Sequence, residues 1–453
     1  MAAAPAMPAD PGELIRSKQY RVLLIFAAII GVVVSLVSWG FLELIYYLQH
    51  GIYKHLPGDL GFSSVPVWWP LPWLALAGLL TAIAITRMPG AGGHVPADGL
   101  KPGGAPTRPI DLPGVLLAAL ASIGLGLVLG PEAPLIAIGM GLGAFAIHQA
   151  RKDAPDQLLA LMGAAGAFAA ISSLFGSPVV GAVIIVEATG LGGATLPVIL
   201  LPGLLAAGIG SLIFIGLDNL TGLGTFSLAL PGLPGFGQPT VAEFGWAIVI
   251  GLAAAVLGPV ILWLSMSVHR YAAKRVMIVL PLAGVAVAVL TIIYTQTTGK
   301  PSSDVLFSGQ SQIGPLIQHA SSYSVGALLL LLVCKTLAYG VSRGSFRGGP
   351  IFPALFIGAA GGVAMSHLPG LPLVAGVAMG IGALTAAVMK LPLTSVLLAS
   401  LLLLSDATKV MPLVIVAVVV AYVAVARIEP RLAGRLPGGE KTDSGAHADT
   451  ALA

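Results

Sequence analysis

Apolar stretches follow one another along almost the whole chain, with short polar or Gly/Pro-rich breaks between them. They lie at residues 22–47, 68–86, 112–129, 135–150, 157–175, 178–188, 193–216, 242–268, 276–296, 325–341, 351–366, 372–389, 391–404 and 410–426. A helix that crosses a bilayer needs about 20 apolar residues. Several stretches are shorter and are bounded by Gly or Pro, which is typical of broken helices that meet inside a membrane. The pattern predicts an all-α polytopic membrane protein.

Gly/Pro motifs of the first part of the chain recur in the second part. Residues 130–134 read GPEAP and residues 349–353 read GPIFP, 219 residues later, and each is followed by Ile-Gly at the same spacing. Residues 162–178 and 379–392 repeat their Met-Gly, Ala-Ala and Pro positions at offsets of 217 to 214 residues. General use of Gly and Pro in membrane helices is the alternative explanation. The shared order and offset favour an internal duplication.

Composition supports a membrane location and excludes several other classes of protein. Of the 453 residues, 57% are hydrophobic and 9% are charged, whereas a soluble domain carries about 25% charged residues. Cys334 is the only cysteine and the eight histidines show no metal-ligand spacing, so we expect no disulfide within the chain, no metal site and no cofactor. No H-E-x-x-H, P-loop or G-x-S-x-G motif is present, so an enzyme is not expected.

The formal net charge is +4, but the basic residues do not form the stripe that binds nucleic acid. They gather at the ends of apolar stretches, as in the positive-inside pattern of membrane proteins. The groups are Arg16, Lys18 and Arg21; Arg151 and Lys152; Arg270, Lys274 and Arg275; and Arg427, Arg431 and Arg435. We expect no nucleic-acid partner, both termini in the cytoplasm, an even number of crossings and a location in the cell membrane.

The chain divides into one predicted membrane domain and two tails. Residues 1–20 are rich in Ala and Pro, and residues 437–453 are rich in Gly, Ser and charged residues, so both are predicted to be disordered cytoplasmic tails. Residues 21–436 form the predicted transmembrane domain, with repeat halves at approximately 21–218 and 240–432.

Each of the two GPxxP motifs predicts the start of a helix inside the membrane. Pro is favoured at the first helical position because its missing N–H would be unpaired there. The N–H groups that follow have no partner within the helix and carry partial positive charge. A buried helix start can therefore bind an anion without a cation. The residues expected to line the anion site are Gly130, Pro131, Ala133, Gly349, Ile351 and Phe352.

Glu132 lies in the first of these helix starts. A carboxylate at membrane depth costs about 3 kcal/mol or more, and a transported anion would compete with it for the same N–H groups. We therefore predict that Glu132 is a gate, which occupies the site when ionised and leaves it when protonated. The alternative is a helix-end carboxylate that only complements the helix dipole.

Other charged residues in apolar surroundings allow more than one interpretation each. Glu187 lies near the end of a short apolar stretch, where it could line an aqueous vestibule or brace a neighbouring helix. Lys335 could reach the membrane surface, pair with a carboxylate or cap a helix end. Arg343 and Arg347 precede the second motif and could attract anions towards it, or could be topology signals.

These motifs resemble the CLC family of chloride channels and proton/chloride antiporters. The family motif G-[KR]-E-G-P is similar to residues 130–134, with Glu132 at the place of the gating glutamate, and G-x-F-x-P is similar to residues 349–353. Residues 177–187 and 391–395 also resemble paired helices of the family. The resemblance implies an inverted-repeat fold, broken helices that meet at a midplane anion site, and a homodimer with one pore per subunit.

The chain departs from the family pattern at four positions. Ala91 takes the place of an anion-binding serine and Leu432 that of a pore tyrosine, so the resemblance implies that both line the anion site. Ala188 takes the place of the inner proton-transfer glutamate of the antiporters, which leaves the adjacent Glu187 as a candidate proton relay. Pro350 removes an N–H from the second motif.

The predicted function is transport of inorganic anions, most of all chloride, through a pore gated by Glu132. Ala188 favours a channel-like or weakly coupled pathway, while retention of Glu132 keeps a proton/chloride antiporter as an alternative. A transporter of another anion, such as fluoride or nitrate, is the second alternative. The expected partners are the anion, the lipid bilayer and a second copy of the chain.

Overall fold

The computed structural model describes residues 11–100, 107–193, 196–221, 235–403 and 406–433. Its longer α-helices are α2 (Lys18–His50), α4 (Pro70–Arg87), α5 (Leu112–Ala119), α6 (Glu132–Ala150), α7 (Asp156–Phe175), α8 (Pro178–Thr189), α9 (Leu196–Thr221), α10 (Val241–Lys274), α11 (Val276–Thr298), α13 (Val325–Ser345), α14 (Ile351–Met365), α15 (Leu373–Met389), α16 (Pro392–Leu403) and α17 (Ala407–Ala433). Short helices are α1 (Pro11–Arg16), α3 (Leu56–Asp59) and α12 (Ile313–Gln318). The all-α prediction is confirmed.

Helix length and surface chemistry fit a bilayer. In the described part of the chain, nine helices are long and apolar enough to cross a membrane, and five shorter apolar helices accompany them. Their outer faces expose large apolar side chains, such as Ile25 and Ile29 on α2 and Val256 and Trp263 on α10. Lipid, unlike water, tolerates such faces. The chain is therefore an integral multi-pass membrane protein, while the parity of the crossings stays a prediction.

The predicted duplication is visible in how helices pack. In the first half, α6 lies against α7 where Gly139 meets Gly166, and in the second half α14 lies against α15 where Gly358 meets Gly380. A Cβ atom added at any of these glycines would collide with the backbone of the opposite helix. Glycine therefore sets the close approach of both helix pairs, and the two pairs stand in the same order along the chain.

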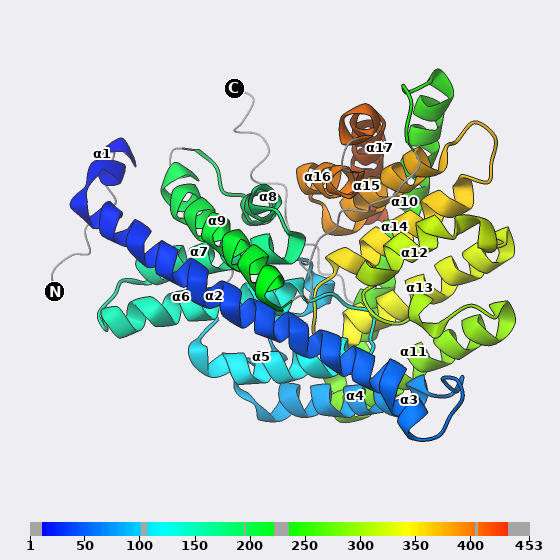
Figure 1. Ribbon diagram of the computed structural model, residues 1–453, viewed down its shortest axis with the longest axis horizontal. Helices are drawn as coiled ribbons and strands as arrows, with labels where there is room; N and C mark the ends of the chain where they lie inside the picture. Colours follow the sequence, from blue (N-terminus) through cyan, green and yellow to red (C-terminus); the bar gives the residue numbers. More distant parts are fainter. Residues whose placement is uncertain (1–10, 101–106, 194–195, 222–234, 404–405, 434–453) are drawn as a thin grey trace.

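The short helices of the two halves meet inside the molecule. Figure 1 shows α6 and α7 beside the N-terminal part of the long helix α2, while α3, α4 and α11 lie by its C-terminal end. The yellow helices α13 and α14 come from the other half and approach the same interior. This arrangement brings the start of α14 to the start of α6.

The predicted N-terminal tail is too long. Residues 11–20 are helical in the structure: α1 ends at Arg16, and α2 begins at Lys18 after Ser17, whose hydroxyl accepts a hydrogen bond from the Tyr20 N–H at 3.0 Å. Serine is a favoured residue before a helix because it satisfies such an N–H. Residues 1–10 and 437–453 of the predicted tails lie outside the described residues.

Candidate functional site

The two GPxxP motifs face each other in the interior. Helix α6 begins at Glu132 directly after Pro131, and α14 begins at Ile351 directly after Pro350. The Gly130 N–H donates to the Gly349 carbonyl at 2.7 Å, and the Gly349 N–H donates to the Gly130 carbonyl at 2.5 Å. These two hydrogen bonds join the segment before α6 to the segment before α14. The starts of the two helices therefore lie close together.

The Glu132 side chain reaches across to the start of the opposite helix. It is fully buried, and its Oε1 accepts a hydrogen bond from the Phe352 N–H at 2.9 Å. Its Oε2 has no hydrogen-bond partner among the described residues. A Cβ atom at Gly130 or Gly349 would collide with this carboxylate. The two glycines thus leave a space that an oxygen-sized anionic group fills.

Two aromatic residues hold the second helix start in place. Phe352 stacks on Phe175 of α7, with ring centroids 5.3 Å apart and planes at 23°. Tyr339 of α13 is fully buried and donates its hydroxyl to the Pro350 carbonyl at 2.7 Å. Sequence reasoning missed Tyr339, because nothing in a strongly apolar helix marks which side chain turns towards a loop eleven residues later.

Ala91 lies in a strained loop between α4 and α5. Residues 90–93 all have positive φ angles, of 75°, 46°, 72° and 89°. Glycine adopts this conformation freely, but Ala91 does so at a cost. The Ala91 carbonyl accepts from Nη2 of Arg347 at 3.4 Å.

Leu432 belongs to the last turn of α17, and the position of its side chain is outside the described part of the structure.

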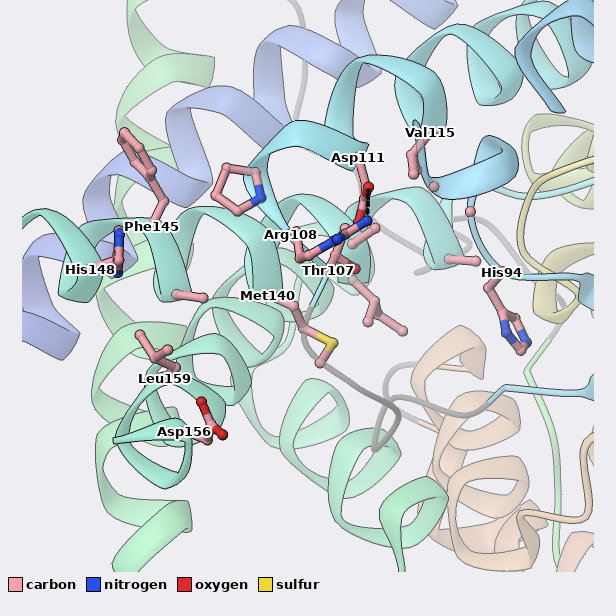
Figure 2. Close-up of a pocket in the computed structure, with 17 residues that line it drawn as sticks. His94, Thr107, Arg108, Asp111, Val115, Met140, Phe145, His148, Asp156 and Leu159 are labelled. Carbon is pink, nitrogen blue, oxygen red and sulfur yellow. Dashed lines mark hydrogen bonds and ion pairs between the residues drawn. The ribbon is translucent and has the colours of Figure 1, made fainter. Parts of the chain in front are cut away.

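A large cavity leads towards the start of α6. It measures about 920 Å³ and extends along α6 from Ala133, the residue after Glu132, to His148. Figure 2 shows Arg108 and Asp111 on its wall, joined by an ion pair with a distance of 3.0 Å between Nε and Oδ2. The residues of the loop 90–93 that line it are Gly90 and Gly93. An anion could therefore enter from this side as far as the residue that follows Glu132.

A second cavity, of about 720 Å³, lies near the C-terminal end of α2. Its lining includes Gln49, Lys300 and Phe307. Lys335, fully buried in α13, donates to the Leu306 and Phe307 carbonyls at 2.8 and 3.0 Å. It therefore holds the loop that connects α11 to α12.

Asp304, in the same loop, accepts hydrogen bonds from the hydroxyls of Tyr294 and Tyr323, at 2.8 and 3.0 Å. Burial raises the pKa of the Asp304 carboxyl, although these bonds and the charge of Lys335 oppose the rise. These polar contacts fix the wall of the second cavity.

Glu187 braces a neighbouring helix. Its Oε1 accepts from the Leu393 N–H at 2.8 Å, and its Oε2 accepts from the Thr394 N–H at 2.7 Å, at the start of α16. Unpaired N–H groups at a helix start favour such a carboxylate. The geometry matches the bracing interpretation, and the relay role of Glu187 stays a prediction.

The Glu187→Gln variant is expected to lower the free energy of unfolding by about 1 kcal/mol, because a neutral amide caps the start of α16 less well. Anion flux should be retained. Thermal unfolding and flux of the same purified protein check this expectation. Unchanged stability would contradict the bracing role. If the wild type does move protons, loss of that movement in the variant would support a relay.

No group of three or more His, Cys, Asp or Glu side chains that could hold a metal ion occurs among the described residues. Cys334 is buried with a free thiol. The arrangement at the centre is one of two helix starts with their backbone N–H groups and one carboxylate, and such helix starts are suited to bind anions.

Residues 97–426 match the family described as voltage gated chloride channel. The protein YfeO of Escherichia coli O9:H4, which is provisionally named as an ion-transport protein, is 30% identical over 371 residues, covering 79% of this chain and 82% of YfeO. YfeO of Shigella boydii is also 30% identical, over 368 residues, with the same coverage of both chains.

Two solved structures are similar in fold. A slow cyanobacterial Cl⁻/H⁺ antiporter matches with a TM-score of 0.73 and 20% identity, covering 90% of this chain and 94% of that one. A CLC-type fluoride/proton antiporter matches with a TM-score of 0.66 and 18% identity, covering 90% of this chain and 96% of that one. The predicted CLC-like inverted-repeat fold is confirmed.

Proposed function

Because this chain belongs to the voltage gated chloride channel family, we propose that it transports small inorganic anions, most of all chloride, with Glu132 as the gate. One observation carries the proposal: the Glu132 carboxylate accepts a hydrogen bond from the Phe352 N–H at 2.9 Å. That N–H belongs to the first turn of α14, where a helix offers donors and partial positive charge to an anion. The carboxylate therefore occupies a place that suits the transported ion.

The gating step follows from competition for these donors. The ionised Glu132 side chain and a chloride ion are both anions, and the buried site has room for one of them at the Phe352 N–H. Protonation removes the charge of Glu132 and with it the attraction to the helix start. The side chain can then leave, and an anion that arrives through the cavity beside Ala133 can take its place.

We propose a channel-like or weakly coupled pathway, since Ala188 supplies no carboxylate at the inner proton position that the family resemblance implies. A proton/chloride antiporter is the second candidate, because Glu132 is retained and one structural neighbour is a Cl⁻/H⁺ antiporter. Fluoride is a further candidate substrate, since another neighbour is a fluoride/proton antiporter. Family members are transporters or channels, and we propose no enzymatic activity.

The proposed assembly is a homodimer in the cell membrane, with both termini in the cytoplasm. Exposed apolar side chains on α9 and α16, such as Leu212 and Leu393, are available to a second copy as well as to lipid. The basic residues at the helix ends support the orientation.

Chloride efflux from proteoliposomes, with external pH recorded at the same time, tests the proposal. We expect chloride flux with little or no coupled proton movement. Chloride flux that drives protons uphill would establish the antiporter instead. No flux of chloride, accompanied by flux of fluoride or nitrate, would change the substrate, and no flux of any of the three anions would contradict the proposed function.

A further inference from the structure

Two arginines lie in the interior beside the helix starts. Arg343, in the last turn of α13, is fully buried, and its Nε donates to the Pro96 carbonyl at 3.0 Å. Arg347, in the connection between α13 and α14, is 8% exposed. Its Nη1 donates to the Phe346 carbonyl at 3.3 Å and its Nη2 to the Ala91 carbonyl at 3.4 Å.

Both guanidinium groups keep unused donors, and neither forms an ion pair with any described residue. Nη1 of Arg343 and Nε of Arg347 have no hydrogen-bond partner among the described residues. Among the residues that the structure describes, no carboxylate oxygen lies within 4.0 Å of a nitrogen of either guanidinium group. Asp98 is the acidic residue whose charge acts on Arg347, from beyond that distance. A buried charge without a partner is costly, so these cations favour an anion beside them.

A small cavity lies next to Arg347. Its volume is about 10 Å³, which is room for one particle of the size of a water molecule. Its lining includes Arg347, Gly92, His94, Ala133 and Pro134. The residues Ala133 and His94 also line the large cavity, so the two cavities adjoin.

From this geometry we propose that Arg347 binds the transported anion in the small cavity, one step before the Glu132 site. The inference rests on the proposed function and adds a ligand to it. Arg343, four residues earlier, is a second buried cation with a free donor, but it is not part of the cavity lining. Ala91 offers no side-chain hydroxyl, but the Arg347 guanidinium lies against its carbonyl, so a permanent cation lies beside the position where the family pattern has a neutral donor. The fitting ligand is a small monovalent inorganic anion.

The test titrates chloride, nitrate and fluoride against the purified full-length protein and its Arg347→Gln variant. The anion-dependent rise in unfolding temperature and the half-saturating concentration for flux are measured together. We expect Arg347→Gln to raise the half-saturating concentration by about tenfold or more, as loss of a charge-assisted hydrogen bond implies. Arg151→Gln, at the exposed end of α6, removes the same charge elsewhere and should leave the concentration unchanged.

Several outcomes would overturn the assignment. If the wild type transports an anion and Arg347→Gln keeps its half-saturating concentration, Arg347 is not a ligand, while the proposed function stands. A merely structural role would lower the unfolding temperature without anion and leave the anion-dependent rise unchanged. If the glutamine variant does not fold, Arg347→Lys decides, with several-fold weaker binding expected because an ammonium lacks the planar fork. If the wild type neither binds nor moves any of the three anions, the proposed function fails as well.

Discussion

Replacement of Glu132 by glutamine is expected to abolish the pH dependence of anion flux. In the wild type, flux should rise as pH falls, by about tenfold per pH unit where the carboxylate is mostly ionised, because the protonated fraction changes by that factor. The glutamine variant has the shape of the protonated acid and cannot ionise. Its flux should therefore match the maximum of the wild type at every pH, and Glu132→Ala should also leave flux insensitive to pH.

The measurement is initial chloride efflux from proteoliposomes over a series of pH values. Asp406→Asn is the matched control, since this carboxylate forms an ion pair with Lys409 at 2.8 Å and is not among the residues expected to line the anion site. Its flux should keep the pH dependence of the wild type. A wild-type pH profile in Glu132→Gln would exclude Glu132 as the gate, even if transport itself were intact.

Local chemistry explains why the centre of the fold could be predicted from the sequence. Pro131 and Pro350 mark helix starts by their missing N–H, and the nearly constant offset between the two motifs indicates that they are equivalent. Equivalent helix starts in two halves are expected to meet, and the bonds between Gly130 and Gly349 show that they do. Glu132 could be singled out because a carboxylate in such apolar surroundings requires a reason.

Hydrogen bonds between residues far apart in the sequence could not be predicted in the same way. The acceptors of Lys335 lie about thirty residues earlier in the chain, and that of Arg343 lies 247 residues earlier. No local pattern encodes which carbonyl such a side chain will reach, because this depends on how the helices pack. The bracing of α16 by Glu187, 206 residues away, has the same origin. Helix α1 (Pro11–Arg16) was not predicted because six residues are too few to show an apolar periodicity.

The second large effect is expected from Gly358→Ala in α14. A methyl group at this position would collide with the Gly380 carbonyl oxygen, and would lie 2.8 Å from the Gly380 carbonyl carbon and 2.9 Å from the Ile381 Cα. These are backbone atoms, so no side chain can rotate away, and α14 and α15 would have to separate. Overpacking costs about 1–3 kcal/mol, and a clash with backbone atoms belongs to the upper end of this range. Because α14 carries the Phe352 N–H, its displacement should also abolish gated flux.

Gly361, three residues further along the same helix, provides the control. Apart from the backbone of α14 itself, no described atom lies within 4 Å of a Cβ atom placed there, so Gly361→Ala should be neutral or should stabilise the helix by about 0.5–1 kcal/mol. Yield of monodisperse protein and thermal unfolding in detergent compare the two variants. Equal stability of both would contradict the close approach of α14 and α15.

The duplication places the same contact in both halves, where Gly139 of α6 meets Gly166 of α7. Gly139→Ala should therefore lower the stability of the protein as Gly358→Ala does.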